Sequence, residues 1–215
     1  MQLRPPKEIY IILDLNGVLI KRWDKNPLLP GIFRKTKKWI QLRPGCIEFL
    51  EKAFSFFQVG IWSTMKPINV QSICALIEQE AHQRLPFFMI WGQDSCYQHS
   101  GLHRPDKAHV AADFKPMSLV WKNFPHLGFH NTILVDDSPY KACMNNPHNC
   151  IFPDAFDGCT EDTFLTDVLW PYLESMRVSY DIQSFISNNR LGQQPITVGH
   201  ELYNHVSRVM KRNWI

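Results

Sequence analysis

The chain contains 215 residues, of which 45% are hydrophobic and 20% are charged, and this is enough apolar material for one folded domain of ordinary size. Its 23 lysines and arginines outnumber its 20 aspartates and glutamates only slightly, so the charge indicates neither a nucleic-acid nor a membrane partner. No apolar run approaches the roughly 18–20 residues that span a bilayer, and residues 1–8 lack the apolar stretch of a signal peptide. We therefore expect a globular protein of the nucleus or cytoplasm.

The six cysteines form no C-x-x-C pair, and a chain of this length does not need disulfides to hold a core. Reduced thiols are expected. Histidine and cysteine are frequent over 126–159, but structural zinc ligands come mostly in pairs about two to four residues apart, so a zinc site is disfavoured.

Three short apolar runs predict buried parallel strands. Residues 9–13, 57–62 and 132–135 are rich in apolar residues, and each run stops at polar residues. Helical patterns at 46–56 and 70–81 follow the first and second runs along the chain. Strands that alternate with helices predict an α/β fold with a doubly wound parallel sheet.

The remaining segments carry other patterns. Residues 21–38 are basic and contain Asn-Pro and Pro-Gly pairs, so a solvated loop is expected, and 92–114 are expected to form a second irregular connection. Apolar spacing predicts helices around 165–173 and 178–186, and a last amphipathic helix near 199–212.

The sequence predicts one domain over residues 1–190. A glycine and a proline within residues 191–195 interrupt the helical pattern, so residues 191–215 are expected to be a helical extension that packs on the same domain. Neither an internal repeat nor a low-complexity tract divides the chain further.

Polar residues follow the three predicted strands at their carboxyl ends, where ligands gather in parallel sheets. They are Asp14 and Asn16, Ser63 and Thr64, and Asp136 and Asp137. Carboxylates on neighbouring loops repel one another unless a cation lies between them, and hard oxygen ligands suit Mg²⁺. Such residues also occur as plain turn formers, so the residues alone leave both interpretations open.

The motifs resemble a known superfamily. Residues 13–19 (LDLNGVL), 61–64 (IWST), a lysine before the last strand and 134–139 (LVDDSP) resemble, in order, the four motifs of the haloacid dehalogenase superfamily. Residues 42–45 (LRPG), together with VDDSP, are similar to its branch of RNA polymerase II C-terminal-domain phosphatases, the NLI-interacting-factor-like family. The resemblance covers roughly residues 7–190 and implies a Rossmann-like sheet with a small or absent cap.

The resemblance implies a role for each motif. Asp14 matches the nucleophile that receives the phosphoryl group, and Ser63 matches the hydroxyl that binds the phosphoryl oxygens. Lys115 is chosen as the lysine that offsets charge on the phosphoryl group, and Lys107 and Lys122 remain alternatives because the loop length departs from the family pattern.

The acidic motif completes the implied site. Asp136 is expected to orient the lysine, whereas Asp137 is expected to bind Mg²⁺ together with Asp14 and the main-chain carbonyl of Asn16. The family usually has aspartate at the position of Asn16, where it protonates the leaving oxygen and activates water. An amide can do neither, and loss of general acid–base catalysis typically costs about 10²–10⁴-fold in rate.

Two functions follow. The first is an Mg²⁺-dependent phosphoprotein phosphatase with an aspartate nucleophile, slowed by Asn16; the second is an inactive pseudophosphatase that binds a protein or phosphopeptide. The short spacing between Asp14 and Ser63 implies an open cleft, and the basic segment 21–38 could attract a phosphoprotein or an acidic protein segment. Nucleic acid is not expected as a partner, because the tryptophans are not interleaved with basic residues along one strand.

Overall fold

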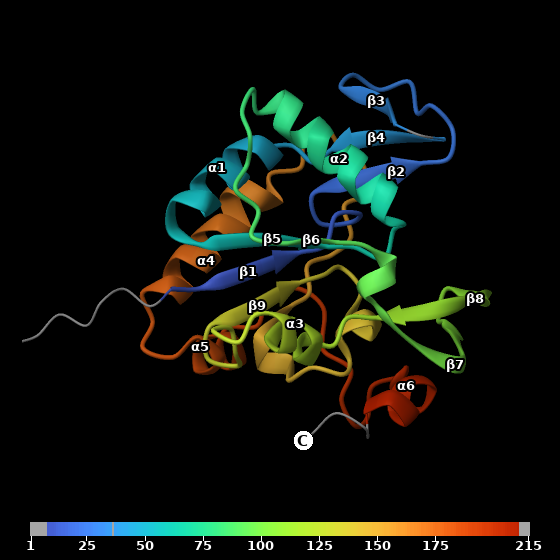
Figure 1. Ribbon diagram of the computed structural model, residues 1–215, viewed down its shortest axis with the longest axis vertical. Helices are drawn as coiled ribbons and strands as arrows, with labels where there is room; N and C mark the ends of the chain where they lie inside the picture. The colour runs from blue at the N-terminus through green and yellow to red at the C-terminus, as the bar shows by residue number, and fades with distance from the viewer. Residues whose placement is uncertain (1–7, 36, 211–215) are drawn as a thin grey trace, which may run out of the picture.

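A five-stranded parallel sheet lies at the centre of the computed structural model, which describes residues 8–35 and 37–210 (Figure 1). Its strand order is β10-β9-β1-β5-β6. The strands are β1 (Tyr10–Leu13), β5 (Gln58–Trp62), β6 (Ile90–Trp91), β9 (Thr132–Val135) and β10 (Cys150–Ile151). The predicted α/β class with a parallel sheet is confirmed.

The register of the sheet aligns the carboxyl ends of the three central strands. Leu13 at the end of β1 pairs with Val135 of β9 on one side and with Ile61 of β5 on the other. The polar residues that follow these strands therefore lie along one edge of the sheet.

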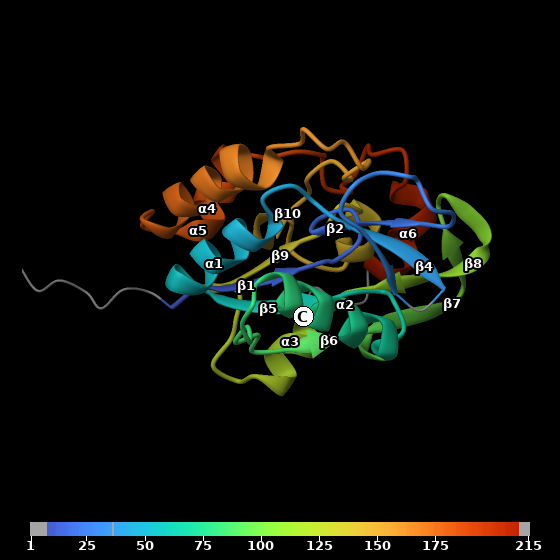
Figure 2. The same ribbon diagram turned by 90° about the horizontal axis from the view of Figure 1, so that it is seen from above.

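Helices cover both faces of this sheet. Leu13, Ile61 and Val135 point to one face, where they share an apolar core with α1 (Cys46–Phe56), α2 (Pro67–Glu80), α4 (Trp170–Arg177) and α5 (Ile182–Asn188). Ile12 and Leu134 point to the other face, against α3 (Met117–Asn123). Figure 2 shows the strands side by side with α1 and α2 in front of them.

Local sequence explains where the first two helices begin. Gly45 precedes α1 with φ of 72°, a left-handed conformation that glycine adopts without a Cβ penalty. Pro67 is the first residue of α2, where its missing N–H leaves no helical hydrogen bond unmade. Phe49, Leu50 and Ala53 recur at helical spacing on the buried side of α1.

The expected loop over 21–38 is wrong in part, since residues 24–31 form a connection without strand or helix. The segment 21–38 lies within an antiparallel sheet of three strands, in the order β2-β4-β3. The strands are β2 (Ile20–Trp23), β3 (Ile32–Lys35) and β4 (Lys38–Leu42). Lys21 lies over the ring of Trp23 at 5.5 Å, and Arg34 lies over Trp39 at 5.7 Å, so basic residues that suggest a loop cover aromatic rings of a sheet.

The expected irregular connection over 92–114 is also wrong in part. Most of it is a hairpin of β7 (Tyr97–Arg104) and β8 (Lys107–Phe114), whose register shifts along its length. Leu102 and Phe114 are buried, but the polar and apolar residues between them do not alternate strictly. The sequence therefore does not show the two-residue period of a strand in this hairpin.

The C-terminal elements differ from the predicted helices in their boundaries. A π-helical segment, Phe164–Leu169, leads into α4, and Asp181 caps α5 by accepting hydrogen bonds from the main-chain N–H groups of Gln183 and Ser184. The last helix is α6 (Tyr203–Met210), and the final two residues of its predicted span, 211 and 212, lie outside the described residues.

The segment after residue 190 packs on the rest of the fold. Val206 and Val209 of α6 are buried in one cluster with Phe114 and Tyr140, and Gln193 donates from Nε2 to the carbonyl of Asp137 at 2.7 Å. The division of the chain at residue 190 stays a prediction.

Across residues 8–35 and 37–210, no helix has both the length and the apolar character that crossing a membrane requires.

Candidate active site

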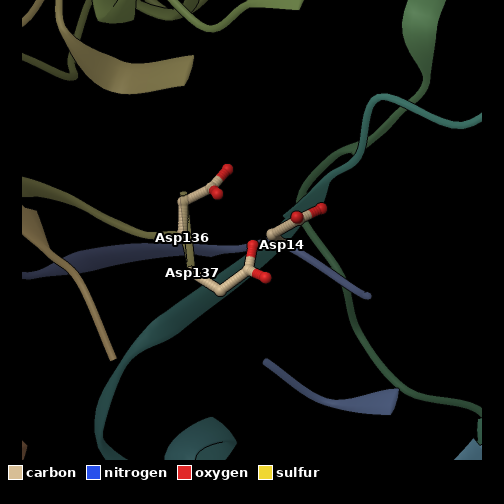
Figure 3. A group of neighbouring side chains, drawn as sticks. All are labelled: Asp14, Asp136 and Asp137. Atoms are coloured by element: carbon tan, nitrogen blue, oxygen red, sulfur yellow. The ribbon is translucent and has the colours of Figure 1, made fainter. Parts of the chain in front are cut away.

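Three carboxylates converge at the carboxyl edge of the central sheet (Figure 3). Asp14 follows β1, and Asp136 and Asp137 follow β9. One carboxylate oxygen from each lies within 4.8 Å of the other two. Asp14 and Asp136 are buried and Asp137 is partly buried, so little water separates the three charges.

Main-chain hydrogen bonds fix the two strand ends that carry these carboxylates. The N–H of Asp14 donates to the carbonyl of Val135 at 2.9 Å, which extends the pairing of β1 with β9 by one residue. The carboxylate of Asp14 accepts at Oδ1 from the N–H of Leu15 at 2.8 Å, and that of Asp136 accepts at Oδ1 from the N–H of Ser138 at 2.9 Å.

Lys115 is fully buried beside two of the carboxylates. Its Nζ lies 2.5 Å from Oδ2 of Asp136 and 3.2 Å from Oδ1 of Asp14. Lys107 at the start of β8 and Lys122 in α3 are both exposed. Of the three lysines considered from the sequence, the structure therefore brings Lys115 to the carboxylates.

A second lysine, Lys141, was not anticipated from the sequence. It lies in the short turn Pro139–Ala142, and its Nζ is 2.8 Å from Asp14 Oδ2, 3.1 Å from Asp136 Oδ1 and 3.2 Å from Asp137 Oδ1. A signal was present, because a lysine four residues after an aspartate lies on the same side of a helical turn.

Burial and these lysines shift the pKa values of the carboxyl groups in opposite directions. Burial raises the pKa of Asp14, but Lys115 and Lys141 outweigh it and hold that pKa at about 2. Burial raises the pKa of Asp137 to about 6, with Lys141 opposing the shift and Asp136 adding to it. Asp14 is therefore the more firmly ionised of the two.

The loop after Asp14 packs directly on Asp137. Gly17 has φ of 93°, and a Cβ atom placed there would lie 2.0 Å from Oδ2 of Asp137, so only glycine fits.

The side-chain oxygen of Asn16 accepts a hydrogen bond from the N–H of Arg22 at 3.0 Å. The Asn16 amide is thus oriented by the first residues of the three-stranded sheet.

Ser63 lies at the same sheet edge, directly after β5. It is buried, its N–H donates to the carbonyl of Trp91 at 3.0 Å, and its Oγ accepts from the N–H of Met65 at 3.4 Å. Leu13 pairs with Ile61, so continuing this register places Trp62 beside Asp14. Ser63 is the next residue after Trp62.

Arg43 of the LRPG segment supports the loop that follows Asp14. Its buried guanidinium donates two hydrogen bonds to Asp162, at 2.7 and 2.8 Å, and Nη1 also donates to the carbonyls of Gly17 and Val18, at 3.5 and 3.4 Å. It also lies over the ring of Phe164 at 4.5 Å. The partner Asp162 belongs to no sequence motif and lies far away in the chain, so the sequence does not indicate this pair.

A cavity of about 520 Å³ opens beside Asp137. Asp137, Ser138 and Tyr140 line it on the side of the sheet. Arg104 of β7 and the C-terminal segment at His200 and Glu201 line it on the other sides. The hairpin and the C-terminal segment therefore form the walls of a cleft that reaches Asp137.

The fold and this arrangement define a class of protein. A parallel α/β sheet that carries aspartates at the ends of two adjacent central strands, here β1 and β9, with a buried lysine between them, is the haloacid dehalogenase-like phosphatase architecture. The family model of NLI interacting factor-like phosphatases matches residues 9–183, and the chain belongs to this family.

Individual relatives are more distant. The chain is 28% identical, over 191 residues, to an uncharacterised FCP1 homology domain-containing protein of Schizosaccharomyces pombe, covering 81% of this chain and 75% of that protein. Two solved structures of Fcp1, an RNA polymerase II CTD phosphatase, are also similar; one is the fission yeast enzyme bound to beryllium fluoride. Each has a TM-score of 0.49, with 14% and 13% identity and 97% and 96% of this chain covered. The chain spans 51% and 62% of those two proteins.

Proposed function

We propose that the chain is an Mg²⁺-dependent phosphoric-monoester hydrolase that acts on phosphoprotein through an aspartate nucleophile, with its rate limited by Asn16. The observation that carries this proposal is the buried contact of Asp14 with Lys115, at 3.2 Å. A carboxylate kept ionised at a strand end, next to a cation able to offset phosphoryl charge, is equipped for nucleophilic attack on phosphorus.

The residues present fit a magnesium ion. Oxygens of Asp14, Asp136 and Asp137 lie within 4.8 Å of one another, and the main-chain carbonyl of Asn16 belongs to the same loop. Hard oxygen donors of this kind suit Mg²⁺. We assign Asp14, Asp137 and the Asn16 carbonyl as its ligands, and the ion, when bound, offsets the charge of the phosphoryl oxygens.

The side chains then divide the chemistry among them. An oxygen of Asp14 attacks phosphorus, the bond from phosphorus to the leaving oxygen breaks, and an aspartyl phosphate forms on Asp14. Lys115 and the hydroxyl of Ser63 bind the phosphoryl oxygens, while Asp136 holds Lys115 in place. Water then attacks the aspartyl phosphate, which releases inorganic phosphate and restores the carboxylate.

Asn16 limits both steps. The leaving oxygen needs a proton in the first step and the attacking water must lose one in the second, and an amide exchanges neither at neutral pH. Its oxygen is already held by the N–H of Arg22. Substrates with good leaving groups, such as aryl phosphates, are therefore expected to react faster than phosphoserine.

A protein substrate suits the cleft better than a small metabolite. The cavity beside Asp137 is walled by the β7–β8 hairpin and the C-terminal segment, without a separate cap domain among the described residues. The nearby β2–β4 sheet carries the basic residues of 21–38, which favour a phosphorylated or acidic protein segment. We place this activity in the nucleus or cytoplasm, which imaging of the tagged chain checks.

The test is turnover of an aryl phosphate with Mg²⁺ by the purified chain and by Asp14→Asn. Turnover that disappears in Asp14→Asn and persists in Asp167→Asn, an exposed carboxylate outside the site, supports the enzyme. Calorimetry adds a second measurement, because Asp137→Ala is expected to lose Mg²⁺ affinity. Equal affinity in the wild type and Asp137→Ala would remove the metal assignment.

Asn16 is the specific observation that favours a second candidate. A chain that binds Mg²⁺ and phosphopeptide but shows no turnover with any substrate is a pseudophosphatase that uses the same cleft as a binding module. Fluorescence anisotropy with a labelled phosphopeptide and its unphosphorylated form distinguishes the two, since phosphate-dependent binding without product identifies the module.

A further inference from the structure

Lys141 is placed where it interferes with the chemistry assigned to Asp14. Of the two oxygens of that carboxylate, Oδ1 accepts from the N–H of Leu15 and contacts Lys115, whereas Oδ2 contacts Nζ of Lys141 at 2.8 Å. One oxygen has to attack phosphorus and another has to bind the metal. With Lys141 in this position, Oδ2 already has a cationic partner, which competes with a metal ion for that oxygen.

The same ammonium also contacts the other two carboxylates. Nζ of Lys141 lies 3.1 Å from Asp136 and 3.2 Å from Asp137, so its three N–H donors match one oxygen of each aspartate. Its side chain is only 9% exposed. Contacts of this kind are those of a counter-ion that neutralises a cluster of carboxylates, which is also what a bound divalent cation does.

From this geometry we propose that Lys141 is a built-in counter-ion for Asp14, Asp136 and Asp137, and that Mg²⁺ binds by displacing its ammonium from the carboxylates. This inference rests on the proposed function, because the metal ligands are those assigned above. Lys141 is then a regulatory side chain, and the site converts between a form closed by lysine and a form open to metal and phosphate.

Charge and hydrogen bonding support an exchange over simultaneous binding. Three carboxylates with two lysines carry one net negative charge, and adding Mg²⁺ without moving Lys141 would bury one net positive charge. Displacing the ammonium leaves the cluster neutral. The main chain of Lys141 can stay in place during this change, because its carbonyl accepts from the N–H of Lys115 at 2.7 Å and its N–H donates to Ser138 at 3.0 Å.

The first measurement is Mg²⁺ affinity by calorimetry for the wild type, Lys141→Met and the matched control Lys122→Met, which removes an exposed lysine from α3. Lys141→Met is expected to bind Mg²⁺ more tightly, on the order of tenfold to a hundredfold, because the ion no longer competes with the ammonium. The control is expected to keep the wild-type affinity. Unchanged or weaker binding by Lys141→Met overturns the proposal.

The second measurement separates displacement from simple repulsion between the lysine and the metal. An amine-reactive acylating reagent, followed by peptide mass spectrometry, reports how accessible each lysine is. Mg²⁺ is expected to increase the labelling of Lys141 severalfold, while Lys115, which is fully buried between two carboxylates, stays protected. Labelling of Lys141 that does not rise with Mg²⁺ overturns the exchange.

Two controls keep this test separate from that of the proposed function. If Lys141→Met folds only when Mg²⁺ is added, the metal replaces the ammonium as counter-ion, and the proposal is supported; if it does not fold at all, Lys141→Gln takes its place in both measurements. If Asp137→Ala binds Mg²⁺ as the wild type does, the metal assignment fails and the exchange fails with it. If only the Lys141 results are negative, the proposed function stands.

Discussion

The N–H of Lys115 donates a hydrogen bond to the carbonyl of Lys141 at 2.7 Å, so the main chain joins the two lysines that face Asp14. The carbonyl of Lys115 in turn accepts from the side chain of Asn145 at 2.8 Å. The two segments that bring positive charge to the carboxylates are therefore held together as one unit, although one follows β8 and the other follows β9.

Replacing Asn16 by aspartate is expected to raise phosphatase activity. Asn16→Asp restores a group that can protonate the leaving oxygen and activate water, and its second oxygen can still accept the hydrogen bond from Arg22. The expected gain is about 10²–10⁴-fold, larger for phosphoserine than for an aryl phosphate. Steady-state rates on both substrates measure it.

The control for this change is Asn16→Ala, which loses the hydrogen bond from Arg22 and supplies no acid. It is expected to be no faster than the wild type. An Asn16→Asp variant that folds and binds Mg²⁺ but turns over neither substrate would show that more than the proton shuttle is missing, and would favour the binding module.

Removing the Lys115 ammonium is expected to lower both stability and activity. Lys115→Met leaves Asp14 and Asp136 in a buried site with one cation fewer, which typically costs about 3–5 kcal/mol of unfolding free energy. Activity is expected to fall about 10²–10³-fold because the phosphoryl charge is no longer offset. Urea unfolding and turnover of an aryl phosphate check the two effects. A Lys115→Met variant as active and as stable as Lys122→Met would contradict both.

The parallel sheet could be predicted from the sequence because its strands are short, continuous apolar runs. Residues 132–135 form β9 over the predicted range, and 57–62 differ from β5 by one residue. The β2–β4 sheet and the β7–β8 hairpin could not be predicted in this way. They are half-exposed, their apolar and polar residues follow no strict alternation, and loop-forming pairs such as Asn26-Pro27 lie in the connections between their strands.

The residues of the candidate site also differ in how far the sequence predicts them. Asp14 and Asp136 directly follow strands and Asp137 comes one residue later, so the sequence places all three at the sheet edge, and they could be found from it. Lys141 and Asp162 reach their partners through the packing of turns. No sequence pattern indicates Asp162. The spacing of Lys141 from Asp137 indicates only that these two lie on one side of a turn, so the contacts of Lys141 with Asp14 and Asp136 became apparent only from the structure.

The pair of Arg43 and Asp162 is expected to make stability depend on pH. Burial raises the pKa of Asp162, but hydrogen bonding and attraction to Arg43 hold it below its usual value. A carboxyl group whose pKa is lowered by folding stabilises the protein above its unfolded pKa, near pH 4, and loses this effect as pH falls through the lower folded value. Asp162 therefore contributes fully at pH 7 and little in strong acid.

Asp162→Asn tests this dependence. At pH 7 the variant is expected to be less stable by about 1–3 kcal/mol, because the buried Arg43 guanidinium loses its charged partner. The difference is expected to shrink as pH falls below 4. Urea unfolding across this range measures it, with Asp167→Asn as an exposed control. A difference that stays constant with pH would mean that Asp162 acts through shape and not through charge.

Gly17→Ala is expected to damage the metal site through sterics alone. Gly17 has φ of 93°, and an added Cβ would meet Oδ2 of Asp137 at 2.0 Å, so Asp137 or the loop must move. Gly31→Ala is the matched control, because Gly31 also has positive φ, 66°, but nothing lies within 4 Å of its added Cβ. Gly31→Ala therefore measures the cost of the backbone conformation without the clash, about 1 kcal/mol.

The comparison of the two alanine variants isolates the contact with Asp137. Gly17→Ala is expected to lose about 2–4 kcal/mol of unfolding free energy, since strain in the left-handed region and the clash add together. It is also expected to bind Mg²⁺ at least about tenfold more weakly, because a ligand displaced by as little as 1 Å no longer meets the ion's strict geometry. Gly31→Ala is expected to keep the wild-type Mg²⁺ affinity. Thermal unfolding and calorimetry on both variants provide the measurements, and equal Mg²⁺ affinities in the two would show that Asp137 does not need its present position to bind the metal.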